Sequence, residues 1–349
     1  MSEKASARVS EKAGERIGQP ATGGGRIVQF LRWGVGLGAA ALSIRLLVRE
    51  LDWAAVVQAL RSADYRWVSL ALLAIVATFF VRAWRWQALL YRSEARLLPV
   101  MTALLVGQAV NTALPMRSGD LVRAAWIGPE RGTGTSTALG SVALEKVWDL
   151  LALLACAILL LVWIPLPGWF AESTWGTAAT LSVGVGTLWG LLHWQDPLFR
   201  RAAQVLERFP AGWSAALLPR LRRLALGVES IRRPEASARA LFWTVLTWGL
   251  GALANWAVLA AFGIPSMSAA VFLLAALMLG GAVVPTPGRL GVFEGICVAS
   301  LALFDVPGDL ALAVGLALHL VVMGPPLVTA ALLALVRVNR LGIGVRSEE

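Results

Sequence analysis

Apolar stretches of about 20 residues recur along the chain, and the segments between them hold most of its arginines. At about 1.5 Å per residue, a helix of that length crosses the roughly 30 Å hydrocarbon core of a bilayer. A mean hydropathy of +0.70 and 58% hydrophobic residues exceed what a soluble core of 349 residues would hide. Helices satisfy their own backbone hydrogen bonds in lipid, and the alternation typical of barrel strands is not visible. We therefore expect an all-α, polytopic membrane helix bundle.

Six of the apolar stretches are long and uninterrupted enough to be complete spans. They are residues 27–48, 67–88, 136–163, 175–194, 239–262 and 308–336. Residues 1–26 are polar and charged without apolar periodicity, which predicts a disordered cytoplasmic tail. The first apolar run contains Arg32 and Arg45 and has no clear cleavage site, so we expect an uncleaved span rather than a signal peptide.

Two further apolar regions cannot be single helices in lipid. Residues 99–127 contain Pro115 and Arg117 near their middle, and residues 268–304 contain Pro287 and Arg289. Proline removes a backbone donor and clashes with the preceding turn, and charges at membrane depth are expensive. Each region is therefore expected to fold back on itself as a re-entrant helical hairpin.

Basic residues predict the orientation. The tail before the first span is basic, the segment from Gln195 to Arg239 holds nine arginines against four acids, and three more arginines follow the last span. The positive-inside rule places all three on the cytoplasmic side, so both termini are cytoplasmic. The hairpins at 99–127 and 268–304 must then enter from opposite faces.

The predicted organisation is consequently an inverted-topology repeat, in which each unit consists of two spans, a hairpin and a third span. The first membrane repeat covers residues 27–163. The second covers residues 164–336 and includes an amphipathic connector at 195–238, and residues 337–349 form a cytoplasmic tail. Pro115 and Pro287 begin similar Pro-x-Arg-x-Gly turns 172 residues apart, about half the chain.

The paired turns suggest an anion site. Broken helix ends present unpaired N–H groups and a positive dipole end, and an arginine adds a planar donor fork suited to phosphate. Our hypothesis is a polar cavity that holds a phosphate-bearing headgroup. The candidate substrate-binding residues are Asn111, Arg117, Asp120, Arg123, Arg289 and Glu294. A structural alternative stays open, in which Arg117 pairs with Asp120 and Arg289 with Glu294.

A second polar cluster lies in the span at 136–163. Glu145 and Asp149 are four residues apart and share a helix face, with Lys146 beside them. They are either counter-charges for the arginines or proton carriers in a coupled cycle. His319 in the last span is either a hydrogen-bonded structural residue or a proton-handling group.

Other classes of site find little support. The net charge of +10 lies in loops between apolar stretches, which fits anionic lipid headgroups rather than nucleic acid. Cys156 and Cys297 both lie in apolar runs, so we predict neither a disulfide framework nor a metal site. We find no nucleotide-binding loop, no metal-ligand set and no nucleophile paired with a base, and we expect no cofactor and no catalytic residue.

Three motifs, Gly107 to Arg123, Glu145 to Asp149 and Pro285 to Glu294, together resemble the transmembrane flippase-like domain of lysylphosphatidylglycerol synthases and its stand-alone relatives. The resemblance covers nearly the whole chain after the tail and implies movement of lipids or lipid-linked headgroups between leaflets. The family often has Arg where this chain has Lys146, and often an Arg near the position of His319. The synthases carry a soluble aminoacyl-transfer domain after the membrane part, whereas 13 residues follow the last span here, so we expect no lysyl-lipid synthesis.

The leading functional hypothesis is a translocator, not an enzyme, that moves an anionic phospholipid or polyprenyl-phosphate-linked lipid. The alternatives are an intramembrane lipid-modifying enzyme with Glu145 or Asp149 as base, and an ion-coupled transporter of a small anionic solute. The expected location is a bacterial-type cytoplasmic membrane, and the expected partners are anionic or phosphate-bearing lipids, with a homo-oligomer left open.

Overall fold

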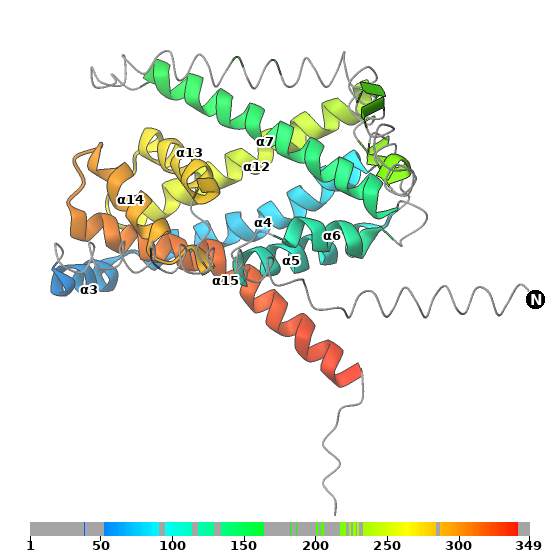
Figure 1. Cartoon of the computed structure of the whole chain (residues 1–349). Helices are drawn as coiled ribbons and strands as arrows, with labels where there is room; N and C mark the ends of the chain where they lie inside the picture. The colour runs from blue at the N-terminus through cyan, green and yellow to red at the C-terminus, as the bar shows by residue number, and fades with distance from the viewer. Residues whose placement is uncertain are drawn as a thin grey trace, which may run out of the picture.

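The computed structural model describes residues 52–90, 95–113, 118–128, 134–163, 233–283 and 287–340, with residue 38 and isolated positions between 182 and 229. All regular elements in these ranges are helices (Figure 1). They are α3 (Trp53–Ser62), α4 (Tyr65–Leu89), α5 (Leu97–Ala113), α6 (Gly119–Ile127), α7 (Thr135–Trp163), α12 (Pro234–Ala261), α13 (Met267–Val283), the short 3₁₀ helix η3 (Pro287–Arg289), α14 (Val292–Ala302) and α15 (Gly308–Arg340).

Three of the described helices are long and apolar enough to cross a membrane, namely α4, α12 and the Gly308–Thr329 part of α15. The 29-residue α7 coincides with the expected span at 136–163 and carries charged residues in its first half. The expectation of an all-α membrane helix bundle is confirmed. The expected spans at 27–48 and 175–194 lie outside the described residues, apart from isolated positions.

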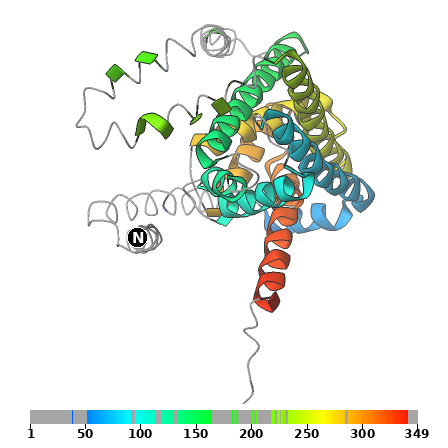
Figure 2. The ribbon, with the colours of Figure 1, turned by 90° about the vertical axis from the view of Figure 1, so that its right-hand side faces the viewer.

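The helices α4 and α12 form an extended antiparallel pair along one side of the bundle (Figures 1 and 2). Trp67, near the start of α4, packs edge-on against Trp256, near the end of α12, with ring centroids 5.2 Å apart. At the other end, Trp84 stacks on Trp243 at 5.1 Å. Aromatic pairs of this kind add to the stabilisation that comes from burying their large surfaces, so α4 and α12 are held together at both ends.

Each interrupted apolar region forms two short helices that pack against one another, α5 with α6 and α13 with α14. In the first pair the backbones touch, because a Cβ on Gly119 would lie 1.8 Å from the carbonyl oxygen of Gly107. Asn111 accepts a hydrogen bond from the Gly119 N–H at 2.8 Å and so caps the start of α6. The predicted helix breaks are present. Their re-entrant placement in a bilayer stays a prediction.

The helices within the two predicted repeats pack in corresponding ways. In the first, α5 packs on α4 and α6 packs on α7, and in the second α13 packs on α12 and α14 packs on α15. Each hairpin also packs against the last span of the other repeat, α5 on α15 and α13 on α7. This arrangement brings the turn between α13 and α14 against α5 through η3. The two interrupted regions therefore meet inside the bundle.

The segments that precede α4 and α12 occupy corresponding places as well. α3 packs on α15, and Asp52, the N-cap residue of α3, donates its backbone N–H to Oδ1 of Asp309 at 2.8 Å. In the other half, Gly140 of α7 lies against the backbone of Leu224 and Gly227, where a Cβ would meet the Leu224 carbonyl oxygen at 2.2 Å. α15 is thus contacted by the segment that precedes α4, and α7 is contacted by part of the segment that precedes α12.

Candidate functional site

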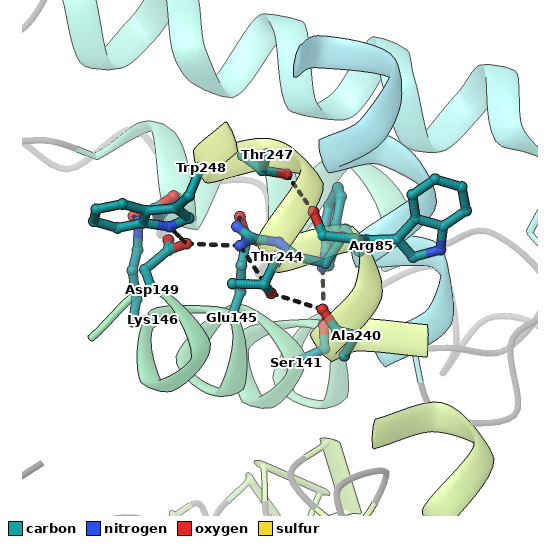
Figure 3. Close-up of polar contacts among 12 residues, drawn as sticks. Arg85, Ser141, Glu145, Lys146, Asp149, Ala240, Thr244, Thr247 and Trp248 are labelled. Carbon is teal, nitrogen blue, oxygen red and sulfur yellow. Dashed lines mark hydrogen bonds and ion pairs between the residues drawn. The ribbon is translucent and has the colours of Figure 1, made fainter. Parts of the chain in front are cut away.

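An ion-pair network joins α4, α6 and α7 in the interior. Arg85 donates from Nη2 to Oε1 of Glu145 at 2.8 Å and from Nη1 to Oδ1 of Asp149 at 2.7 Å (Figure 3). Thr244 and Trp248 of α12 approach the same groups, at 3.4 Å from Arg85 Nη1 and 3.5 Å from Asp149 Oδ1. The four-residue spacing of Glu145 and Asp149 places both carboxylates within reach of one guanidinium.

Glu145 is shared between two arginines. Its second oxygen, Oε2, accepts from Nη1 of Arg123 at 2.7 Å, and its side chain is completely buried. Arg123 also contacts Asp120 on its own helix at 3.0 Å, and its guanidinium lies 4.9 Å from the centroid of a Trp86 ring. Burying charges is costly unless they are paired, so this arrangement stabilises the interior only as long as every partner is present.

The outer edge of the network is more accessible. Lys146, which is about half exposed, lies 3.3 Å from the second carboxylate oxygen of Asp120. Asp120 therefore bridges Arg123, which is buried, and Lys146, which is not. Trp86 fixes the position of α4 beside α7 by donating its indole N–H to the Ser141 hydroxyl at 3.0 Å.

A cavity of about 370 Å³ opens beside the network. Small-molecule sites in proteins typically occupy about 300–1,000 Å³. Its charged lining residues are Arg82, Arg85, Asp120, Lys146, Asp149 and Arg289. Its apolar lining residues include Ile75, Phe79, Leu274, Met278, Val322 and Met323. The cavity is amphipathic and is lined by both halves of the chain.

The turn between α13 and α14 contributes Arg289 to this cavity. Gly288, Arg289 and Gly291 have φ values of 60°, 56° and 78°, which belong to the left-handed region. Glycine adopts such angles at little cost, but an arginine does so with strain of the order of 1–3 kcal/mol. A tight turn therefore places a charged residue where a regular helix would not.

Apart from Glu294 and His319, the sequence-predicted residues divide into three groups. Asn111, Asp120, Lys146, Asp149 and Arg289 line the cavity. Arg123 and Glu145 do not line it, and form the buried pair beside it. Arg117 lies outside the described residues.

Glu294 and His319 form a separate site between α14 and α15. Oε1 of Glu294 is hydrogen-bonded to Nδ1 of His319, and Oε2 accepts from the Gly291 N–H at 2.8 Å. Glu294 is the third residue of α14. Its carboxylate therefore caps the start of that helix through Gly291 and also bonds to His319 of the neighbouring span. Both oxygens of the carboxylate are occupied in this way. The Phe293 ring packs 4.7 Å from the imidazole.

Arg82 and Arg85 belong to the site but were not among the residues predicted from sequence. Both lie on one face of α4, three residues apart, within the stretch that was interpreted as a plain span. Two arginines in an otherwise apolar span were the available signal. Among the described residues, no group of three or more His, Cys, Asp or Glu side chains has the arrangement of a metal site.

The fold and the cavity define a multi-pass α-helical membrane protein with charged groups gathered inside its bundle. The sequence matches the family described as "Lysylphosphatidylglycerol synthase TM region" over residues 33–330, so the chain belongs to that family.

The relatives of this chain include a membrane protein and part of a glycosyltransferase. A UPF0104 membrane protein of Methanothermobacter thermautotrophicus is 27% identical over 293 residues, which cover 79% of this chain and 86% of the relative. The glycosyltransferase AglD of Haloferax volcanii is 29% identical over 164 residues, 46% of this chain and 25% of AglD. The similarity to AglD thus concerns a quarter of that protein.

Proposed function

We propose that this protein is a lipid translocator that moves an anionic phospholipid or a polyprenyl-phosphate-linked lipid between leaflets. The observation that carries the proposal is the cavity, because four cationic side chains and several apolar side chains line it together. The cationic groups suit an anionic headgroup, and the apolar groups suit the beginning of a hydrocarbon chain. We further propose a cytoplasmic membrane location with both termini on the cytoplasmic side.

The position of the cavity supports movement rather than static binding. It lies where the first interrupted region, through Asn111 and Asp120, meets the second, through Arg289. Interrupted helices at the interface of inverted repeats are where many transporters hold their substrates. In this proposal the headgroup passes between the two turns while the hydrocarbon chains stay in the bilayer.

Reconstitution in liposomes tests the proposal. Purified protein would be inserted into vesicles with fluorescent phosphatidylglycerol, phosphatidic acid or polyprenyl phosphate, and loss of signal to a membrane-impermeant quencher would be followed. We expect one of these lipids to reach the outer leaflet faster than in empty vesicles, and Arg289→Gln to slow it. The proposal is wrong if none of the anionic lipids moves faster.

The same vesicles separate the alternatives. An enzyme would change the mass of the lipid, which mass spectrometry of the extracted lipids would detect. A transporter of small anions would admit a soluble phosphate compound into the vesicles without moving the labelled lipid. Unchanged lipid mass together with lipid movement is the result that the translocator proposal requires.

A further inference from the structure

Arg82 and Arg85 lie one turn apart on α4 but have different surroundings. Arg85 is buried and is bonded to the carboxylates of Glu145 and Asp149. Arg82 is partly exposed and lines the cavity. Among the described residues, Arg82 forms no hydrogen bond and no ion pair. The charges of Glu145 and Asp149 act on it through space, but both oxygens of Glu145 and Oδ1 of Asp149 are bonded to Arg85 or Arg123.

The position of Arg82 is energetically costly, because an arginine is charged at every physiological pH and cannot avoid the cost of desolvation by losing a proton. Arg82 lies seven residues before the end of α4, which corresponds to a depth of roughly 10 Å along the helix. A charged side chain inside a membrane protein usually faces a pathway or a ligand. Arg82 lines the cavity, so the cavity is where such a pathway or ligand would lie.

The charge balance of the cavity indicates what it takes. The charged lining residues are four cations and two carboxylates, and the buried Arg123–Glu145 pair beside them adds no net charge, so these eight residues together carry an excess of two positive charges. The cations are Arg82, Arg85, Arg123, Lys146 and Arg289, and the carboxylates are Asp120, Glu145 and Asp149. A terminal phosphate monoester carries about −1.5 to −2 charges at pH 7, whereas a phosphodiester carries a single one.

We infer that Arg82 is the phosphate-binding residue of the cavity and that the cavity is selective for a lipid with a terminal phosphate monoester. The inference rests on the proposed function for the lipid part of the ligand. The guanidinium provides parallel N–H donors for two phosphate oxygens, and its own charge is not neutralised by a carboxylate bond. Gln108, which lines the same cavity, carries a neutral amide donor for a further oxygen.

Binding in detergent tests this inference without requiring transport. Didecanoyl phosphatidic acid would be titrated calorimetrically into the full-length protein at about pH 8, where the monoester is fully ionised because its second pKa is about 6. Didecanoyl phosphatidylmethanol has the same chains and a diester, and inorganic phosphate has no chains. Arg82→Gln removes the charge, and Arg82→Lys keeps it without the planar fork. Arg66→Gln is the matched control, since Arg66 is exposed in the first turn of the same helix.

We expect phosphatidic acid to bind at least about tenfold more tightly than phosphatidylmethanol, a difference of about 1.4 kcal/mol. Arg82→Gln should weaken this binding by at least about tenfold, Arg82→Lys should weaken it less, and Arg66→Gln should leave it unchanged. Inorganic phosphate should bind more weakly than phosphatidic acid in all variants. Apparent melting temperatures establish that each variant is folded, and Arg82→Gln should not lower this temperature because Arg82 has no protein partner among the described residues.

Equal binding of phosphatidic acid by wild type and Arg82→Gln would overturn the inference, as would equal affinity for the two lipids or no binding at all. Inorganic phosphate that binds as tightly as phosphatidic acid would overturn the lipid part. If wild-type protein binds phosphatidic acid through Arg82 but moves no lipid in vesicles, the inference stands and the translocator proposal fails.

Discussion

Replacing Glu145 by Gln removes a charge that Arg85 and Arg123 share in the interior. The substitution keeps the shape of the side chain, but an amide offers one acceptor oxygen where the carboxylate offers two, at 2.8 and 2.7 Å from the two guanidinium groups. Its NH₂ group would face an arginine donor. Breaking a buried ion pair by removing one partner typically costs about 3–5 kcal/mol. Asp149 and Asp120 still neutralise part of the arginine charge, so we expect about 3 kcal/mol, the lower end of that range.

Thermal unfolding in detergent, followed by tryptophan fluorescence, measures this effect. At about 2 °C per kcal/mol for a large domain, the apparent melting temperature of Glu145→Gln should fall by roughly 6 °C. Glu235→Gln is the control, because Glu235 is exposed in the first turn of α12 and its loss should cost below about 1 kcal/mol. Combining Glu145→Gln with Arg123→Gln should cost less than the sum of the single changes. A wild-type melting temperature for Glu145→Gln would refute the argument that the carboxylate balances two buried charges.

Two further substitutions test the hairpins by the same measurement. Gly119→Ala should destabilise the protein by several kcal/mol, since the new Cβ would overlap the Gly107 carbonyl. Gly249→Ala is the control, because nothing lies within 4 Å of its new Cβ and the change should be tolerated or slightly stabilising. Similar melting temperatures for the two variants would contradict the close approach of α5 and α6. His319→Leu should cost about 1–3 kcal/mol because it leaves one oxygen of the Glu294 carboxylate without its buried partner, and an unchanged melting temperature would show that the pair contributes little.

The helix breaks were predictable from sequence because their causes are local. Proline and glycine act on the backbone of their own turn, so Pro115 and Pro287 marked both interruptions before any packing was known. The left-handed φ of Arg289 was not predictable to the same degree, since Gly288 and Gly291 were the residues expected to adopt such angles. The turn takes this conformation in the packed environment between α13, α14 and α5.

The partners of the charged residues were harder to predict because they depend on tertiary packing. Arg85 lies 60 residues from Glu145, and their contact requires α4 to turn one particular face toward α7. Near the end of a span, arginines such as Arg82 and Arg85 can also extend to the interface, which made them unremarkable in the sequence. Glu294 illustrates the same point, because its contact with His319 depends on how α14 packs on α15.

The charged site is asymmetric even though the helices of the two halves pack in corresponding ways. All of its cavity-lining charges except Arg289 come from α4, α6 and α7 in the first half, whereas α12, α13 and α15 contribute neutral polar and apolar lining residues. In the first half, an arginine of α6 is tied to a glutamate of α7, and in the second a glutamate of α14 is tied to a histidine of α15. Of the excess of two positive charges, the first half contributes one, since four cations there face three carboxylates, and Arg289 contributes the other. Arg82 is the cation of α4 that no carboxylate oxygen binds among the described residues, so we expect the attraction of the first half for a phosphate group to centre on Arg82.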